Sequence, residues 1–154
     1  MTATMVALRT RQIPADLDKV LGFQLPLLVD RLSQKLEIAR DEAEKLFEDT
    51  KRFLFLAATH LDPISPTPEI DEGWHAFILF TRDYELFCQE NFGFFVHHAP
   101  SAPGQKTKTL RARFVARQVF GDNLSLNWGV EASGSSDCAP ESNCEAPPAD
   151  CATN

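Results

Sequence analysis

The sequence predicts an all-α protein, a compact bundle of about four to five helices followed by a disordered C-terminal tail. Apolar residues recur three and four positions apart through most of the chain, as on the buried face of a helix. The alternation of apolar and polar residues that is typical of strands never persists beyond a few residues. With 154 residues, 44% of them hydrophobic and 24% charged, the chain has the size and composition of one globular domain.

Two short helices are expected first. Pro14 is typical of the first turn of a helix, and apolar residues follow from Leu17 at helical spacing. Gly22 and Pro26 then interrupt the pattern, because neither residue favours a helix interior. We therefore expect a short helix, a break, and a second helical piece that continues through Leu32.

A long helix is predicted over about residues 40–60. Its apolar residues recur three and four apart, and we expect its charged residues to fill the opposite, solvated face. The charged set is Glu44, Lys45, Glu48, Asp49, Lys51 and Arg52. Residues 62–68 contain three prolines and are expected to form a connection, since proline is excluded from helix interiors.

A single further helix is predicted over about residues 68–91. Thr67 and Pro68 are typical residues at a helix start, and the acidic residues that follow suit the positive end of the helix dipole. Gly93 is a typical residue just beyond a helix end. A short apolar piece and a polar loop are expected after it.

The last helix is predicted over about residues 109–120, ending at Gly121. In the closing segment that follows, we expect Leu124, Leu126 and Trp128 to pack back on the domain. The chain has 12 Phe residues against one Tyr and two Trp, which predicts a core built on phenylalanine.

The composition changes beyond Gly129, which sets the domain boundaries at residues 12–130 for the helical domain and 131–154 for the tail. The tail holds five acidic residues and no Lys or Arg, with few residues that could join a core, so we expect it to be disordered. Its Cys138, Cys144 and Cys151 are spaced more widely than in structural zinc sites. They are either soft ligands for an ion such as Cu⁺ or Zn²⁺ or incidental residues of a solubilising tail. A protein partner that binds through the tail is a separate possibility.

The charge balance bears on partners and location. A formal net charge of −7 excludes nucleic acid as the default partner, because phosphate binding needs a basic surface. No stretch approaches the roughly 20 apolar residues of a membrane span, and the first residues lack the apolar core of a secretory signal. We therefore expect a cytoplasmic protein with reduced thiols.

The residues that suggest chemistry are Asp71, His75, His97 and His98. Asp71 and His75 lie one helical turn apart on the same face, and the two other imidazoles follow the end of the predicted helix. Two histidines and one carboxylate suit Zn²⁺ or non-haem Fe²⁺, so the candidate ligands are Asp71, His75 and one of His97 and His98. The alternative is that Asp71 and His75 form only an ordinary ion pair on a helix surface.

Neighbouring residues have simpler expected roles. His60 is expected to cap the last carbonyl groups of its helix, with a fourth-ligand role as the alternative. Glu69 or Glu72 could serve as a base or support the ligands. Cys88 is expected to be a core thiol, and Trp74 to anchor its helix in the core.

The run from Asp71 to Cys88, continued by FGFFVHH, resembles the short bacterial relatives of plant glycine-rich domain proteins. The matching residues are Asp71, Trp74, His75, Tyr84, Cys88, Phe92, Gly93, His97 and His98, with Phe120, Gly121 and Trp128 similar to the family's closing segment. The resemblance covers about residues 40–128, and the tail departs from it because it has no glycine repeat. It places Asp71, His75 and a later histidine together, which favours a metal site, but it implies no particular reaction.

Three functions remain open from the sequence. The first is a small cytoplasmic metal-binding protein with Zn or Fe as its ion. The second is a metal-dependent hydrolase or oxygenase that uses the same ligands and leaves a coordination position open. The sequence contains no phosphate-binding glycine loop, G-x-S-x-G or H-E-x-x-H motif that would indicate another class of enzyme. The third is a helical protein–protein interaction module in which Asp71 and His75 are structural.

Overall fold

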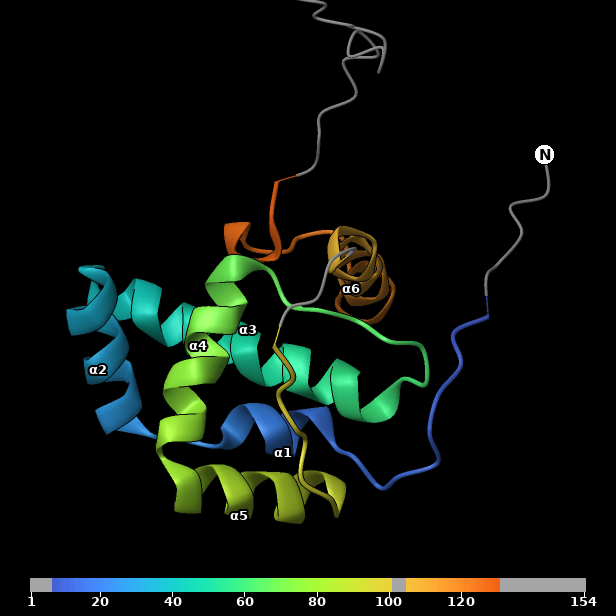
Figure 1. Ribbon diagram of the computed structural model, residues 1–154, viewed down its shortest axis with the longest axis horizontal. Helices are drawn as coiled ribbons and strands as arrows, with labels where there is room; N and C mark the ends of the chain where they lie inside the picture. The colour runs from blue at the N-terminus through green and yellow to red at the C-terminus, as the bar shows by residue number, and fades with distance from the viewer. Residues whose placement is uncertain (1–6, 101–104, 131–154) are drawn as a thin grey trace, which may run out of the picture.

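The computed structural model describes residues 7–100 and 105–130, and within them the chain is all-α, as predicted. Figure 1 shows the arrangement of the helices. The elements are α1 (Leu17–Gly22), α2 (Pro26–Leu36), α3 (Arg40–Thr59), α4 (Pro68–Leu79), α5 (Thr81–Phe92), α6 (Gln105–Phe120) and the 3₁₀ turn η1 (Leu126–Trp128). The predicted disorder of the tail and the roles of its three cysteines concern residues outside those described.

The long helix α3 is the centre of the bundle. Helices α1, α2, α4 and α6 and the turn η1 all pack against it, and α5 is held against α4 and α1 (Figure 1). The short helix, break and second helix predicted at the N-terminus are confirmed as α1 and α2, and the predicted long helix is confirmed as α3. Within the described residues, none of the helices has the length and apolar character needed to cross a membrane.

The predicted single helix over residues 68–91 is wrong, because the chain breaks at Phe80 and forms two helices. This break raises the described α-helices to six, where four to five were expected. Phe80 leaves the helical conformation with ψ 65°, and its N–H bonds the Phe77 carbonyl oxygen at 3.0 Å in a tightened last turn. The turn brings Phe77 edge-on to both Tyr84 and Phe87, with ring centroids 5.1 Å apart in each pair. Packing of these aromatic rings thus outweighs the continuous helical periodicity.

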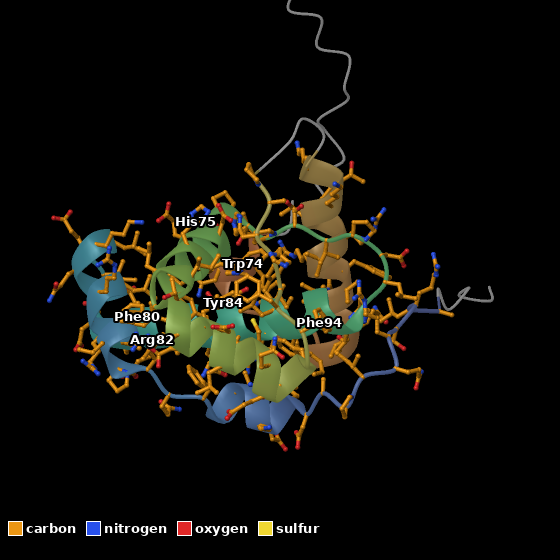
Figure 2. All side chains as sticks on the ribbon, turned by 60° about the horizontal axis from the view of Figure 1, so that its bottom comes forward. Trp74, His75, Phe80, Arg82, Tyr84 and Phe94 are labelled. Carbon is orange, nitrogen blue, oxygen red and sulfur yellow. The ribbon has the colours of Figure 1, made fainter. Side chains whose placement is uncertain are left out.

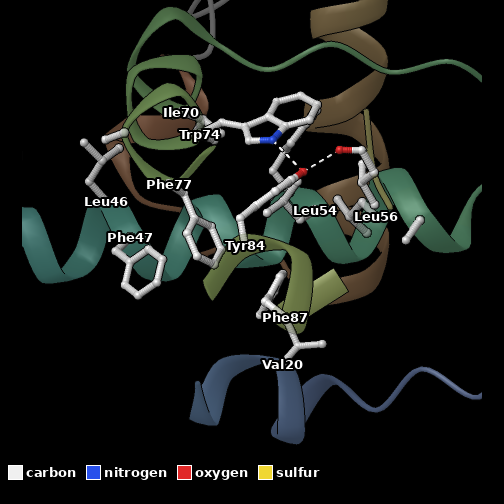
Figure 3. Close-up of a cluster of buried hydrophobic side chains, with 14 of the residues drawn as sticks. Val20, Leu46, Phe47, Leu54, Leu56, Ile70, Trp74, Phe77, Tyr84 and Phe87 are labelled. Carbon is white, nitrogen blue, oxygen red and sulfur yellow. Dashed lines mark hydrogen bonds between the residues drawn. The ribbon is translucent and has the colours of Figure 1, made fainter. Parts of the chain in front are cut away.

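The core is built on phenylalanine, as the composition predicts. Phe53, Phe77 and Phe87 are fully buried, and Phe47 and Phe92 are nearly so. They contact one another and the buried Trp74 and Tyr84, mostly in tilted or edge-on pairs. Figure 3 shows part of this cluster between α3, α4 and α5.

The expectation that all charged residues of α3 lie on a solvated face is wrong for Asp49. Its side chain is only 1% exposed and accepts hydrogen bonds from the hydroxyl of Ser125, the amide of Asn127 and the indole of Trp128. The carboxylate therefore fixes the closing segment on α3. Trp128 is buried as expected, but Leu126 is 79% exposed, so its predicted packing is wrong.

Lys51 is the second charged residue of α3 that is buried. Its ammonium group donates hydrogen bonds to the carbonyl oxygens of Leu21 and Phe23, at 2.7 and 2.8 Å, and lies 4.7 Å from the centre of the Phe47 ring. These contacts satisfy carbonyl groups at the end of α1 that the helix itself leaves unpaired. Lys51 therefore joins α1 to α3.

The buried position of Lys51 predicts a specific pH dependence of stability. Burial lowers the pKa of Lys51 from 10.5 to about 8. Between these values the unfolded chain binds more protons than the folded one, so the contribution of Lys51 to the free energy of unfolding rises with pH. From pH 7 to pH 10 we expect wild type to gain stability relative to Lys51→Met, with a slope below about 1.4 kcal/mol per pH unit, the limit for one proton.

Urea unfolding at a series of pH values measures this difference. Lys45→Met is the matched control, because Lys45 is an exposed lysine of the same helix. The difference in the free energy of unfolding between Lys45→Met and wild type should not change with pH. A flat curve for Lys51→Met as well would contradict the prediction.

Candidate metal centre

The start of α4 is fixed by its N-cap residue, Thr67. The Thr67 hydroxyl accepts the N–H of Ile70 at 3.3 Å and donates to the carbonyl oxygen of Asn127 at 2.5 Å. The first turn of the helix is therefore held both locally and by the closing segment. Asp71 lies in this fixed turn, and His75 lies one turn later on the same face.

The structure brings Asp71, His75 and His98 together. One carboxylate oxygen of Asp71 (Oδ1) lies 2.7 Å from Nε2 of His98, and the other (Oδ2) lies 3.6 Å from Nε2 of His75. The two imidazole rings lie side by side, with centroids 4.5 Å apart. One potential ligand atom from each of the three residues lies within 4.8 Å of the other two.

His98 reaches Asp71 because a buried pair on α4 and α5 holds the chain before it. The indole N–H of Trp74 donates to the Tyr84 hydroxyl at 2.9 Å, and this hydroxyl donates to the carbonyl oxygen of Val96 at 2.5 Å. Figure 2 shows Trp74 and Tyr84 below His75, and Figure 3 shows the two hydrogen bonds. Burial raises the pKa of Tyr84 well above its usual range, so the hydroxyl remains a donor.

The three candidate ligands differ in exposure. The His98 side chain is 15% exposed and its ring packs on Trp74, with centroids 4.3 Å apart. The Asp71 side chain is 27% exposed and that of His75 47%. The cluster therefore has a buried side, formed by His98 and Trp74, and an open side at His75.

His97 lies outside the cluster. It is exposed, and its ring lies against Phe95 with centroids 4.8 Å apart. Successive side chains of an extended segment point to opposite sides, so only one member of the His97–His98 pair can face Asp71. The structure selects His98, a choice that the sequence left open.

His60 and the two glutamates are not part of the three-residue cluster. His60 is the C-cap of α3, and its Nδ1 lies 3.1 Å from the Leu56 carbonyl oxygen, which is the capping contact expected for it. Glu72 pairs with Lys35 at 2.6 Å, and this hydrogen bond lowers the pKa of Glu72. Glu69 is exposed.

Cys88 is a core thiol, as expected. It is fully buried on α5, and burial raises the pKa of its thiol. A raised pKa disfavours the thiolate, which is the form that binds metals.

A cavity of about 510 Å³ adjoins the candidate ligands. Its walls are residues 63–66 of the connection, the start of α4, residues 97–99, and Lys108 and Thr109 of α6. Asp71, Trp74 and His98 form one side of it. A ligand bound near the cluster would therefore lie between α4 and α6.

The donor set has the composition and nearly the spacing of a metal site. Ligands about 2.0–2.2 Å from a tetrahedral Zn²⁺ lie about 3.3 Å from one another. The distances of 2.7 and 3.6 Å, to the two oxygens of Asp71, lie on either side of this value, and all three donor atoms lie within 4.8 Å of one another. Binding an ion would therefore require the side chains to move closer around it. Two imidazoles and one carboxylate are ligands of both Zn²⁺ and Fe²⁺. Three protein ligands leave further coordination positions free.

The supporting contacts were missed from the sequence. Tyr84 matched the family pattern, but its sequence position gave no sign that its hydroxyl would hold the carbonyl of Val96. The cavity wall at Lys108 was also missed, because Lys108 belongs to a later helix, α6, and helical spacing does not relate it to the cluster. The available signal was the helical spacing that places Tyr84 on one face with Phe80, Phe87 and Cys88.

A family model described as UCP032817-like matches residues 18–118. The matched segment includes Asp71, His75 and His98, and also the Trp74–Tyr84 pair. No curated protein and no solved structure matches the chain. Since the match covers more than half of the sequence, the chain belongs to the UCP032817-like family.

Proposed function

We propose that this chain is a metal-binding protein that holds a divalent ion, Zn²⁺ or Fe²⁺, through Asp71, His75 and His98. The observation that supports the proposal is the convergence of three donor atoms within 4.8 Å from two separate segments of the chain. Two nitrogen ligands and one carboxylate are a combination that both ions accept.

The alternative, a simple ion pair on a helix surface, would need only Asp71 and His75. Here a third donor, His98, comes from a segment beyond α5 that the buried Tyr84 hydroxyl holds through Val96. A half-buried imidazole packed on Trp74 is also a more rigid donor than a surface histidine. Both features favour a built site over a chance pair.

A metal-dependent hydrolase or oxygenase is the second candidate, and the adjoining cavity favours it. Structural zinc sites commonly use four protein ligands, whereas catalytic zinc sites use three and keep a position open. The cluster has three ligands and lies beside a cavity of about 510 Å³, which is large enough for a small substrate.

Other expectations accompany this proposal. The cytoplasmic location, the binding of a protein partner through the C-terminal tail and the resemblance to glycine-rich domain proteins stay predictions. So does the absence of nucleic-acid partners, which follows from the net charge of −7.

The proposed site is tested by thermal melting with and without Zn²⁺ and with a chelator. An ion bound only by the folded state raises the melting temperature, and removal of one ligand should abolish most of this rise. We expect Zn²⁺ to stabilise wild type and the chelator to reverse the effect. Asp71→Ala, His75→Ala and His98→Ala should lose the response to both reagents.

His97→Ala is the matched control, because it removes the neighbouring imidazole that lies outside the cluster. It should respond like wild type. Isothermal titration calorimetry should give a stoichiometry of one ion per chain, with an affinity that falls as pH drops through the histidine range. Wild type that neither binds Zn²⁺ or Fe²⁺ nor responds to the chelator would refute the proposal.

A further inference from the structure

The cavity beside the candidate metal centre has a second chemical feature, a lysine. The cavity is lined by Lys108 of α6 and also by Asp71 and His98 of the candidate metal centre. Residues 63–66, which connect α3 to α4, line it as well. Lys108 is half-buried, and it has no carboxylate partner among residues 7–100 and 105–130. Lys108 is therefore the one lysine or arginine among the described residues that lines the cavity.

The wall that carries Lys108 is fixed to the rest of the domain. The carbonyl oxygen of Lys108 accepts the N–H of Ser65 at 3.3 Å, and the Thr109 hydroxyl donates to the Pro66 carbonyl oxygen at 3.3 Å. One turn further on, the guanidinium of Arg111 donates to the Pro63 carbonyl oxygen at 2.8 Å. These contacts hold the start of α6 to the connection that forms the next wall.

The remaining surface of the cavity is largely apolar or neutral. Trp74, Ile64 and several prolines line it, and Asp71 and Lys108 are its only acidic residue and its only lysine or arginine among the described residues. Their charges cancel when no ion is bound. A divalent ion at the cluster would change the sum to about +2 and make the cavity attractive to an anion.

We infer that the cavity binds a small carboxylate with an apolar body, with the carboxylate near Lys108 and the metal ion and the body against Trp74 and Ile64. This inference rests on the proposed metal site and names the class of ligand that such a site would take. One carboxylate has two oxygens, one to accept a charge-assisted hydrogen bond from Lys108 and one to bind the metal ion. The apolar walls exclude a ligand that is charged throughout.

The experiment uses benzoate as the probe and the whole chain of 154 residues. Zn²⁺ binding is measured first by calorimetry, for wild type and for Lys108→Met. Benzoate is then titrated into the Zn²⁺-loaded protein, and the indole N–H resonances of the two tryptophans are followed by ¹H–¹⁵N NMR. Trp74 lines the cavity, whereas Trp128 packs on Asp49, so Trp128 is the internal reference.

We expect benzoate to move the Trp74 resonance and to leave that of Trp128 in place. Lys108→Met should weaken benzoate binding about ten-fold, the effect of losing one charge-assisted contact, with Zn²⁺ affinity within two-fold of wild type. Lys106→Met, which removes an exposed lysine of the same helix, should bind benzoate like wild type. Benzamide, the neutral analogue, should bind more weakly than benzoate, and the metal-free protein should bind benzoate more weakly than the loaded protein.

The other outcomes distinguish failure of the proposed metal site from failure of the carboxylate site alone. No Zn²⁺ or Fe²⁺ binding by wild type refutes the proposed function and this inference with it. Zn²⁺ binding without a benzoate-dependent shift of Trp74, or with equal shifts in Lys108→Met, refutes only the inference. A larger shift of Trp74 with inorganic phosphate than with benzoate overturns the assignment to a carboxylate.

Discussion

Gly73→Ala should destabilise the domain by about 3 kcal/mol, at the upper end of the range for overpacked cores. Gly73 lies in the middle of α4 where this helix crosses α3, and a Cβ atom added there would lie 2.2 Å from Oγ1 of Thr50. Thr50 is itself fully buried, and its hydroxyl is bound to the Leu46 carbonyl oxygen, so it cannot turn away freely. The helices would have to separate, which outweighs the gain of about 1 kcal/mol that alanine brings to a helix.

Chemical denaturation measures this effect, and two further variants identify its cause. Gly22→Ala has no atom within 4 Å of its added Cβ and should change stability by less than about 1 kcal/mol. Adding Thr50→Ala to Gly73→Ala removes the clashing oxygen and leaves an ordinary contact at 3.4 Å, so it should restore part of the lost stability. A double variant no more stable than Gly73→Ala would show that the clash with Thr50 is not the cause.

The class of the fold and most helix bounds could be predicted from the sequence, because they depend on local signals. Proline at the start of a helix, glycine after its end and apolar periodicity are read within a few residues. The break at Phe80 has none of these signals. It follows from the packing of Phe77 on Tyr84 and Phe87, which local periodicity does not encode.

The charged residues of α3 show a second limit. Asp49 and Lys51 have the same residue types as the exposed Glu44 and Lys45, and helical periodicity placed all of them on one polar face. Their burial depends on partners far along the chain, namely Trp128 for Asp49 and the end of α1 for Lys51. Pairing with distant groups is a tertiary property, so residue type alone could not reveal it.

At the candidate site, the sequence predicted the candidate ligand types and the proximity of Asp71 to His75, because one helical turn separates these residues. It could not choose between His97 and His98. That choice depends on which side of the segment after α5 faces α4. The segment is held just before His98 by the bond from Tyr84 to the Val96 carbonyl oxygen and by a hydrogen bond between Cys88 and the Val96 backbone. Tyr84 is thus one of the core residues that set the position of His98.

Tyr84→Phe should therefore lower both stability and metal affinity. The substitution leaves the Trp74 indole N–H and the Val96 carbonyl oxygen without their partner, and a buried unpaired polar group costs about 1–3 kcal/mol. We expect a loss of about 2–4 kcal/mol in the free energy of unfolding, measured by urea denaturation. Release of Val96 should also loosen His98, so the Zn²⁺ dissociation constant of the folded protein should rise about ten-fold.

A loss of stability alone would not distinguish positioning of His98 from a purely structural role, so a variant of similar stability is needed. Val20→Ala shortens a fully buried side chain on α1, away from Trp74 (Figure 3). It should cost about 2 kcal/mol through the cavity it leaves and should bind Zn²⁺ like wild type at a temperature where the protein is folded. If Tyr84→Phe binds Zn²⁺ as tightly as Val20→Ala does, Tyr84 stabilises the core without positioning His98.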